Sequence, residues 1–303
     1  MPYQISLAEP AELSGTECTA QVWFKQSWMQ AVASVIDASP KLLLCHDKDN
    51  LVAVMPLYSK KKLWFIKAYN PLLAYYCPIV FTLPETSHKN RSLIRETDIC
   101  AALAMFLKQE FREVFLNLSP QLYDVRGFTW QGLVAQPLYT FVQKTDEKQE
   151  LMTEERHKLR LAERHGFEFE ERFDVDQFCH LLRELHTLKG HDMGMSLSAI
   201  RLFLSEMHKE GLVKQLNVMD KGEVVSSDII VCDGTDTAYA LLRGTTIEGR
   251  KKGASVMQNV YDAKYLASSY RFLDYLGGNI PGPARFKAAC GYNLKLFFRI
   301  RSK

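Results

Sequence analysis

The sequence has no hydrophobic run long enough to cross a bilayer. Its longest apolar segment, Pro71–Phe81, contains two prolines and is far shorter than the roughly 20 residues that a spanning helix needs. Residues 1–20 include acidic side chains and no basic segment before an apolar core, so they do not resemble a secretory signal. We therefore expect a cytoplasmic protein with no membrane span.

The chain also lacks the short signatures of several enzyme classes. It has no HExxH, GxGxxG or Walker-type loop and no Ser-His-Asp order, which argues against zinc protease, dinucleotide-binding, nucleotide triphosphatase and hydrolase functions. Its seven cysteines lie apart, without the CxxC pairs of a zinc site or the density of a disulfide scaffold. His186 and His191 do not have the i, i+4 spacing of helical metal ligands, and no third ligand accompanies them. We expect reduced thiols and no metal.

Size and charge narrow the function further. At 303 residues, with 47% hydrophobic and 24% charged residues, the chain is expected to form two folded domains of ordinary size. A net charge of +3 is too small for nucleic-acid binding across the whole surface, so we expect no DNA partner. A local basic channel is compatible with this charge.

The strongest pattern lies between residues 237 and 294. Apolar side chains recur from Val256 at i, i+4, i+7 and i+11, which predicts a helix. The predicted order is strand, basic loop, helix, strand and helix: Thr237–Leu242, Arg243–Gly253, Ala254–Ser269, Phe272–Gly277 and Pro281–Cys290.

Basic residues directly precede this helix. The free N–H groups and the positive dipole end of a helix N-terminus favour an anion, so the pattern predicts a phosphate seat for a cosubstrate. A solvated charged loop is the competing interpretation. The candidate residues are Arg243, Arg250, Lys251, Lys252, Gly253, Ala254 and Ser255.

The segment before residue 237 predicts further helices and strands of the same domain. Charged and apolar periodicity predicts helices at 147–164, after Asp174 and after Ser198, followed by strands Val213–Met219 and Val224–Cys232 joined by tight turns. The first half repeats this order in shortened form. Polar residues near Asp146 predict a border between domains 1–145 and 146–303, with the last strand free to pack on the first domain.

These segments carry a resemblance to a known family. The motifs of the C-terminal half are Tyr239, Leu242-Arg243-Gly244, Lys252-Gly253-Ala254, Phe272 to Gly278, Ile280-Pro281-Gly282 and Arg285-Phe286-Lys287. Those of the first half are Phe24 to Trp28, Met55 to Tyr58, Asn70-Pro71-Leu72 and Cys77-Pro78. With these motifs the C-terminal half looks like the Fem-type and BioF2-like acyltransferases of the GNAT superfamily, and the first half is similar in the order of its motifs. In the family, Asp-Pro often follows the strand that ends here at Leu118, whereas this chain has Ser119-Pro120, which disfavours peptidoglycan-type aminoacyl transfer.

The resemblance implies both a fold and an activity. The fold would be α+β, with two tandem GNAT-like domains whose mostly antiparallel mixed sheets are flanked by helices. The activity would be N-acyl transfer from acyl-CoA or another carrier to a small-molecule or nucleotide-linked amine, with no permanently bound cofactor. Two alternatives stay open: an aminoacyl-tRNA-dependent transferase that binds a tRNA acceptor stem and acts on a cell-wall or polysaccharide precursor, and a GNAT-fold binding protein without catalysis.

Candidate catalytic residues are Asp228, His186 and Tyr239. Asp228 lies mid-strand among apolar residues, and desolvation favours the protonated form of a carboxylic acid, which suits a general base. The pattern of apolar and polar residues along the strand does not decide whether the Asp228 side chain points inward. Tyr239 lies near a strand end, and His186 lies near the acceptor pocket by resemblance.

Candidate substrate-binding residues come from several segments. Arg156 and Arg160 share one helical stripe suited to phosphates, although neighbouring glutamates are equally compatible with surface ion pairs. Lys189 precedes a glycine, which fits an acceptor pocket or an ordinary helix C-terminus. The full candidate set is Arg156, Arg160, Lys189, His191, Asn279 and Lys287.

Overall fold

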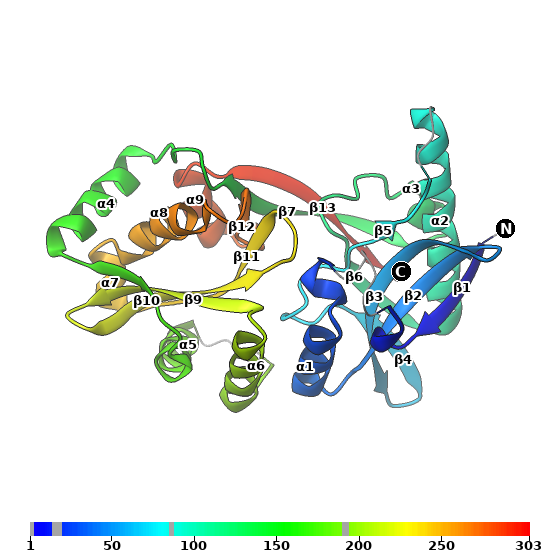
Figure 1. Ribbon diagram of the computed structural model, residues 1–303, viewed down its shortest axis with the longest axis horizontal. Coiled ribbons are helices and arrows are strands. Elements are labelled where there is room, and N and C mark those ends of the chain that lie inside the picture. Colours follow the sequence, from blue (N-terminus) through cyan, green and yellow to red (C-terminus); the bar gives the residue numbers. More distant parts are fainter. Residues whose placement is uncertain (1–2, 14–19, 85–87, 190–193) are drawn as a thin grey trace. The chain divides into compact units, whose positions relative to one another are not determined.

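The computed structural model describes residues 3–13, 20–84, 88–189 and 194–303 (Figure 1). Contacts divide the chain into two compact units, which we call unit 1 (Met1–Leu138 with Leu296–Lys303) and unit 2 (Tyr139–Lys295). The domain border near Asp146 stays a prediction, and the two units are described separately below. No helix in the described part of the chain is both long and apolar enough to span a membrane.

Unit 1 is built on a mixed sheet with strand order β1-β2-β3-β4-β6-β13. All neighbours in this order are antiparallel except β4 and β6, which are parallel, and β5 pairs with β3. The strands are β1 (Tyr3–Ala8), β2 (Ser39–Asp47), β3 (Asn50–Lys62), β4 (Phe65–Tyr69), β5 (Val80–Phe81), β6 (Glu113–Asn117) and the end of β13 (Asn293–Arg301).

A long helix covers the core of unit 1. Ile99, Leu103 and Leu107 of α2 recur at helical spacing and pack with Met55 and Val114 of the sheet. This periodicity explains why the segment is helical and which of its faces is buried. The unit also contains α1 (Gln26–Ile36), α2 (Lys89–Glu110), α3 (Arg126–Trp130) and single helical turns at Pro10–Leu13 and Val22–Phe24.

In unit 2, the sheet has the strand order β7-β12-β11-β10-β9-β8. Its neighbours are antiparallel except β11 and β12, which are parallel. In Figure 1, α4, α8 and α9 lie on one side of this sheet, and α5 and α6 lie on the other. Its strands are β7 (Val134–Lys144), β8 (Glu168–Glu171), β9 (Val213–Asp220), β10 (Glu223–Cys232), β11 (Thr237–Thr245) and β12 (Phe272–Asp274). Its helices are α4 (Thr153–His165), α5 (Val175–Lys189), α6 (Leu197–Lys209), α7 (Ile247–Lys251), α8 (Ala254–Leu266) and α9 (Pro281–Ala289).

The predicted α+β class, with mixed sheets flanked by helices, is confirmed, and several boundaries need correction. The predicted basic loop from Arg243 is wrong, because β11 continues to Thr245 and the short helix α7 follows it. The Thr246 hydroxyl caps α7 by accepting a 3.0 Å hydrogen bond from the Gly249 backbone N–H. Helix α6 is capped by Ser196 rather than by Ser198, since the Ser196 hydroxyl accepts from a backbone N–H in the first turn.

Candidate functional site

Strands β11 and β12 of unit 2 pair over a short distance and then part. Their parallel register ends with Tyr239 opposite Asp274, whereas β11 continues to Thr245. A bulge lies just beyond that point, because Leu241 falls between the residues that oppose Ile229 and Ile230 of β10. The edge of β11 that β12 leaves open carries backbone N–H and C=O groups toward the space between the strands.

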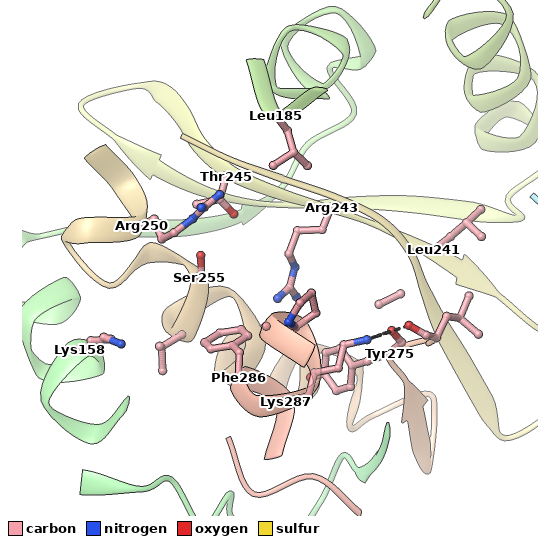
Figure 2. A pocket seen from close by; sticks show the side chains of 15 residues that line it. Lys158, Leu185, Leu241, Arg243, Thr245, Arg250, Ser255, Tyr275, Phe286 and Lys287 are labelled. Carbon is pink, nitrogen blue, oxygen red and sulfur yellow. Dashed lines mark hydrogen bonds between the residues drawn. The ribbon is translucent and has the colours of Figure 1, made fainter. Parts of the chain in front are cut away.

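A cavity of about 600 Å³ occupies this space (Figure 2). Residues from β11, from the chain after β12 and from helices α4, α5, α7, α8 and α9 line it. Four of the lining side chains are basic, and most of the others are apolar. The lining residues are Lys158, Leu185, Ala240, Leu241, Arg243, Thr245, Arg250, Ser255, Val256, Tyr275, Leu276, Gly282, Pro283, Phe286 and Lys287.

One end of the cavity combines cations with a helix start. Figure 2 shows Arg250, Ser255 and Lys158 on the same side of the cavity. Helix α8 begins here after Gly253, which has a φ of 89° and forms no side-chain cap. A Cβ at Gly253 would lie 2.1 Å from the Lys158 carbonyl oxygen, so glycine permits α4 to approach the start of α8. The result is a concave basic surface next to free backbone N–H groups, which suits an anion.

Arg243 lies at the centre of the cavity wall. Its guanidinium donates two hydrogen bonds to the Asp228 carboxylate and one to the Asn259 side-chain oxygen, and it lies 3.5 Å from the Asp262 carboxylate. The two carboxylate side chains have no exposed surface, whereas 27% of the Arg243 side chain is exposed. Burial opposes the charge of Arg243, but the ion pair with Asp228 outweighs it and raises the arginine pKa.

The network continues into α8. Burial, followed by the neighbouring Asp228 charge, raises the pKa of Asp262 well above its ordinary value. The Gln258 amide donates to Asp262 at 2.7 Å and to the Leu216 carbonyl at 3.0 Å. Tyr275 donates to the Asn259 carbonyl at 3.2 Å. The sequence analysis did not single out these residues of α8. Their signal in the sequence is the presence of three polar residues, Gln258, Asn259 and Asp262, on the side of the helix that packs against the sheet.

Lys287 of α9 lies on the other side of Arg243. Its ammonium donates to the backbone carbonyls of Tyr275, Leu276 and Gly277 at 2.6, 2.8 and 2.6 Å. Leu276 and Gly277 both have positive φ, 38° and 73°, and this turn follows the last residue of β12. Burial, with a further contribution from the Arg243 charge, lowers the pKa of Lys287 to about 8.

The structure places four of the predicted cosubstrate and substrate residues on this cavity: Arg243, Arg250, Ser255 and Lys287. Gly253 and Ala254 form the start of α8 beside it. Two predicted cations are absent from the lining. Lys251 is exposed and pairs with Glu248 at 2.8 Å, and Lys252 lies 3.7 Å from Asp220.

The predicted catalytic residues lie behind or outside the wall. Asp228 is fully buried behind Arg243, and Tyr239 is buried in β11, and neither lines the cavity. Asn279 binds the Tyr139 backbone with both ends of its amide, at 2.9 and 3.1 Å. His186 lies on α5, but its side chain is outside the described part of the structure.

The remaining predicted residues are distributed as follows. Arg156 and Arg160 of α4 are exposed, and Arg156 donates to the Leu151 carbonyl at 3.0 Å. Lys158 of the same helix is the residue that reaches the cavity, a position that the arginine stripe did not indicate. The Lys189 side chain and the whole of His191 lie outside the described residues.

Comparison with known proteins identifies the fold. No family model matches the chain. No curated protein matches it in sequence. Among solved structures, FemX is similar with a TM-score of 0.65 and 12% identity, covering 96% of this chain and 94% of FemX. The C-terminal domain of a putative lysylphosphatidylglycerol synthetase from Agrobacterium fabrum is similar with a TM-score of 0.55 and 13% identity, covering 94% of this chain and 90% of that domain.

A tandem GNAT protein from the clavulanic acid biosynthesis pathway is also similar, with a TM-score of 0.53 and 8% identity over 99% of this chain and 97% of that one. These likenesses extend over nearly the whole chain. The fold is therefore that of the Fem-type and tandem GNAT proteins, as the sequence motifs implied. At such identities the likeness concerns the fold, and the activity has to be argued from the cavity.

Proposed function

We propose that the protein is an N-acyltransferase that takes an acyl group from a phosphate-bearing carrier such as acyl-CoA and transfers it to an amine. The observation that carries this proposal is the cavity where β11 and β12 part, with cations and a helix N-terminus at one end and an open strand edge along its side. The basic end can anchor the carrier, the open strand edge can polarise the carbonyl, and Lys287 on the same wall can accept a proton.

The carrier's phosphates would bind at the basic end. Arg250 and Lys158 supply positive charge, and the first backbone N–H groups of α8 supply hydrogen-bond donors beside Ser255. Lys158 also pairs with Glu154 at 2.6 Å, so part of its charge is already neutralised. Arg250 is therefore the principal anchor.

The acyl group would lie along β11. Leu241, the extra residue of the bulge, lines the cavity on the strand edge that β12 no longer covers. A backbone N–H on this edge can donate to the acyl carbonyl oxygen and stabilise the negative charge that develops during attack. Apolar Val256 and Phe286, also on the wall, suit the carrier arm or the acyl chain.

Lys287 is the group that we assign to the proton. The acceptor nitrogen attacks the carbonyl carbon, and the bond from that carbon to the carrier sulfur breaks, so that the carrier leaves as a thiolate. The proton of the nitrogen passes to the neutral Lys287 amine, which in that form has released one of its three carbonyl acceptors. With a pKa of about 8, about a tenth of Lys287 is neutral at pH 7, and the neutral share grows as the pH rises through 8. Asp228 then has a different role from the predicted base, because its carboxylate fixes the Arg243 guanidinium, which lines the same cavity as Lys287.

A pH profile tests the assignment of Lys287. Acyl transfer from a panel of acyl-CoAs to amines should rise with pH through about 8, because the neutral amine is the active form. Lys287→Met should lower kcat by about 10² to 10⁴-fold and abolish the rise. Lys295→Met, which removes an exposed lysine of β13, is the matched control. A rate independent of pH between 6 and 9, or full activity of Lys287→Met, would assign the proton elsewhere.

An aminoacyl-tRNA donor is the second candidate. Helix α4 presents Arg156 and Arg160 to solvent while Lys158 of the same helix lines the cavity, so an acceptor stem could be held next to the basic end. Arg160→Glu should then weaken tRNA binding in a salt-dependent way and leave acyl-CoA binding unchanged. If the protein binds acyl-CoA to saturation and forms no complex with tRNA, the donor is acyl-CoA and not aminoacyl-tRNA.

A further inference from the structure

The hairpin of β3 and β4 in unit 1 ends in an exposed apolar tip. Leu63 and Trp64 form the two-residue connection between Lys62 and Phe65, which oppose each other in the ladder. Leu63 is 82% exposed and Trp64 is 68% exposed, and Ile66 is exposed beside them. In Figure 1 this hairpin extends from the end of its sheet. Large apolar side chains concentrated at a projecting turn contribute little to the core and indicate an interaction site.

Cations surround this tip. Lys61 and Lys62 precede it, and Arg112 approaches from the start of β6 with its guanidinium 4.3 Å from the centre of the Trp64 ring. Lys67 follows the tip in β4, with its ammonium 4.4 Å from the centre of the Tyr69 ring. The Arg112 backbone N–H donates to the Ile66 carbonyl at 3.1 Å, which fixes the arginine beside the hairpin.

The charges around the tip are not neutralised locally. In the described parts of the chain, none of these four basic side chains forms an ion pair with a carboxylate. Lys60, one residue earlier, pairs with Asp37 at 3.5 Å. Glu113 is the register partner of Lys67 across the β4–β6 ladder and offsets one of these positive charges without forming an ion pair with it. The balance around the tip remains positive.

We propose that the β3–β4 hairpin docks the protein on an anionic lipid surface. Leu63 and Trp64 would enter the boundary between headgroups and acyl chains, where the amphipathic ring of tryptophan is favoured. The surrounding cations would contact the lipid phosphates, and each such Lys or Arg strengthens binding to an anionic surface about fivefold. The hairpin lies in unit 1, so this proposal is independent of the acyl-transfer cavity in unit 2.

The geometry favours lipid over other occupants. A stable protein interface buries about 800 Å² on each partner, whereas this tip offers a few convex side chains at a two-residue turn. A second copy of the chain would bring like charges together around the same tip. A nucleic acid would match the cations but would leave Leu63 in water. A lipid surface can accommodate both the apolar tip and the basic side chains around it, because lipid molecules rearrange around an inserted side chain.

Vesicle binding tests the proposal. The full-length protein is mixed with vesicles of phosphatidylcholine alone and with vesicles containing phosphatidylglycerol, and the bound fraction is measured by co-sedimentation. We expect binding to the anionic vesicles, weakened at least tenfold by Trp64→Ser and about 25-fold by Lys61→Gln with Lys62→Gln, which removes two positive charges. Trp130→Ser is the matched control, because Trp130 of α3 is also exposed and has Arg126 5.6 Å from its ring.

Fluorescence gives a second readout that does not depend on sedimentation. Of the four tryptophans, Trp23 and Trp28 are buried, so Trp130→Phe leaves Trp64 as the exposed emitter. Its emission should shift to shorter wavelength when anionic vesicles are added. Absence of binding, binding that Trp64→Ser leaves unchanged, or equal binding to uncharged vesicles would overturn the proposal. Concentration-dependent self-association lost in Trp64→Ser, without vesicle binding, would also overturn it and assign the tip to a second copy.

Discussion

Replacing Arg243 with methionine should destabilise unit 2 severely. Met keeps much of the arginine's length but removes the charge and the hydrogen bonds that hold Asp228 and Asn259. Asp228 and Asp262, which have no exposed surface, would then face each other without a counter-charge. Removing one partner of a buried ion pair costs about 3–5 kcal/mol. Because 27% of the Arg243 side chain is exposed, water can reach the vacated space, and we expect the lower end of that range.

The loss should depend on pH in a defined direction. Burial and Asp228 already raise the pKa of Asp262, and removal of the arginine charge would raise it further. A carboxyl group whose folded-state pKa exceeds its unfolded value, about 3.9, penalises folding above that unfolded value, and the penalty disappears as the pH falls toward it. The variant should therefore be weakest relative to wild type at pH 7 and should approach wild type near pH 4.

Urea unfolding followed by circular dichroism at pH 7 and pH 4.5 measures both effects. Arg201→Met is the matched control, because Arg201 pairs with Asp176 at 2.8 Å on the surface, where such pairs contribute about 0–1 kcal/mol. Adding Asp228→Leu to Arg243→Met should recover part of the lost stability, since it removes one uncompensated charge. If Arg243→Met costs no more than Arg201→Met, or if its loss is the same at both pH values, the argument about the buried carboxylates is wrong.

Other perturbations have equally direct readouts. Gly253→Ala should cost about 1–3 kcal/mol in urea unfolding, because its φ is 89° and a Cβ would lie 2.1 Å from the Lys158 carbonyl oxygen. Gly282→Ala, where a Cβ has nothing within 4 Å, should change the free energy of unfolding by no more than about 0.5 kcal/mol. Equal losses of stability in the two variants would show that the close approach of Lys158 to Gly253 does not matter. The hydrogen bonds from Arg126 lower the Asp124 pKa to about 2, so its contribution to stability is present above pH 4 and is lost as the pH falls through 2. Arg126→Met should return this pKa toward its ordinary value in an NMR titration, and an unchanged value would refute the assigned cause.

Periodicity predicted the elements that bury one face and have clear ends. Helix α8 was expected to begin at Ala254, and it does, because apolar spacing and a glycine at its N-terminus act together. Strands β9 and β10 were expected within a residue of their bounds, since tight turns separate them. The short strand β1 was not predicted, because the alternation of half-buried Tyr3 and Ile5 with exposed Gln4 and Ser6 extends over only four residues at the edge of the sheet.

The site was harder to predict, because it depends on contacts between distant segments. Arg243 was recognised, but its partner Asp228 was interpreted as a base, and sequence alone does not reveal that the two residues oppose each other across β10 and β11. Lys158 was missed because its neighbours formed a clearer arginine stripe, although Lys158 is the one that reaches the cavity. Lys287 was identified through the family motif, whereas its three carbonyl acceptors depend on the turn after β12.

Calorimetric titration with an acyl-CoA measures whether the carrier binds at the basic end of the cavity. We expect Arg250→Glu to weaken binding by about tenfold to a hundredfold, since a charge-assisted hydrogen bond contributes about 1.5–3 kcal/mol. Lys251→Glu, at the adjacent residue outside the cavity lining, should bind as wild type does. Equal affinity of wild type and Arg250→Glu, or a loss confined to Lys251→Glu, would contradict the placement of the carrier in this cavity.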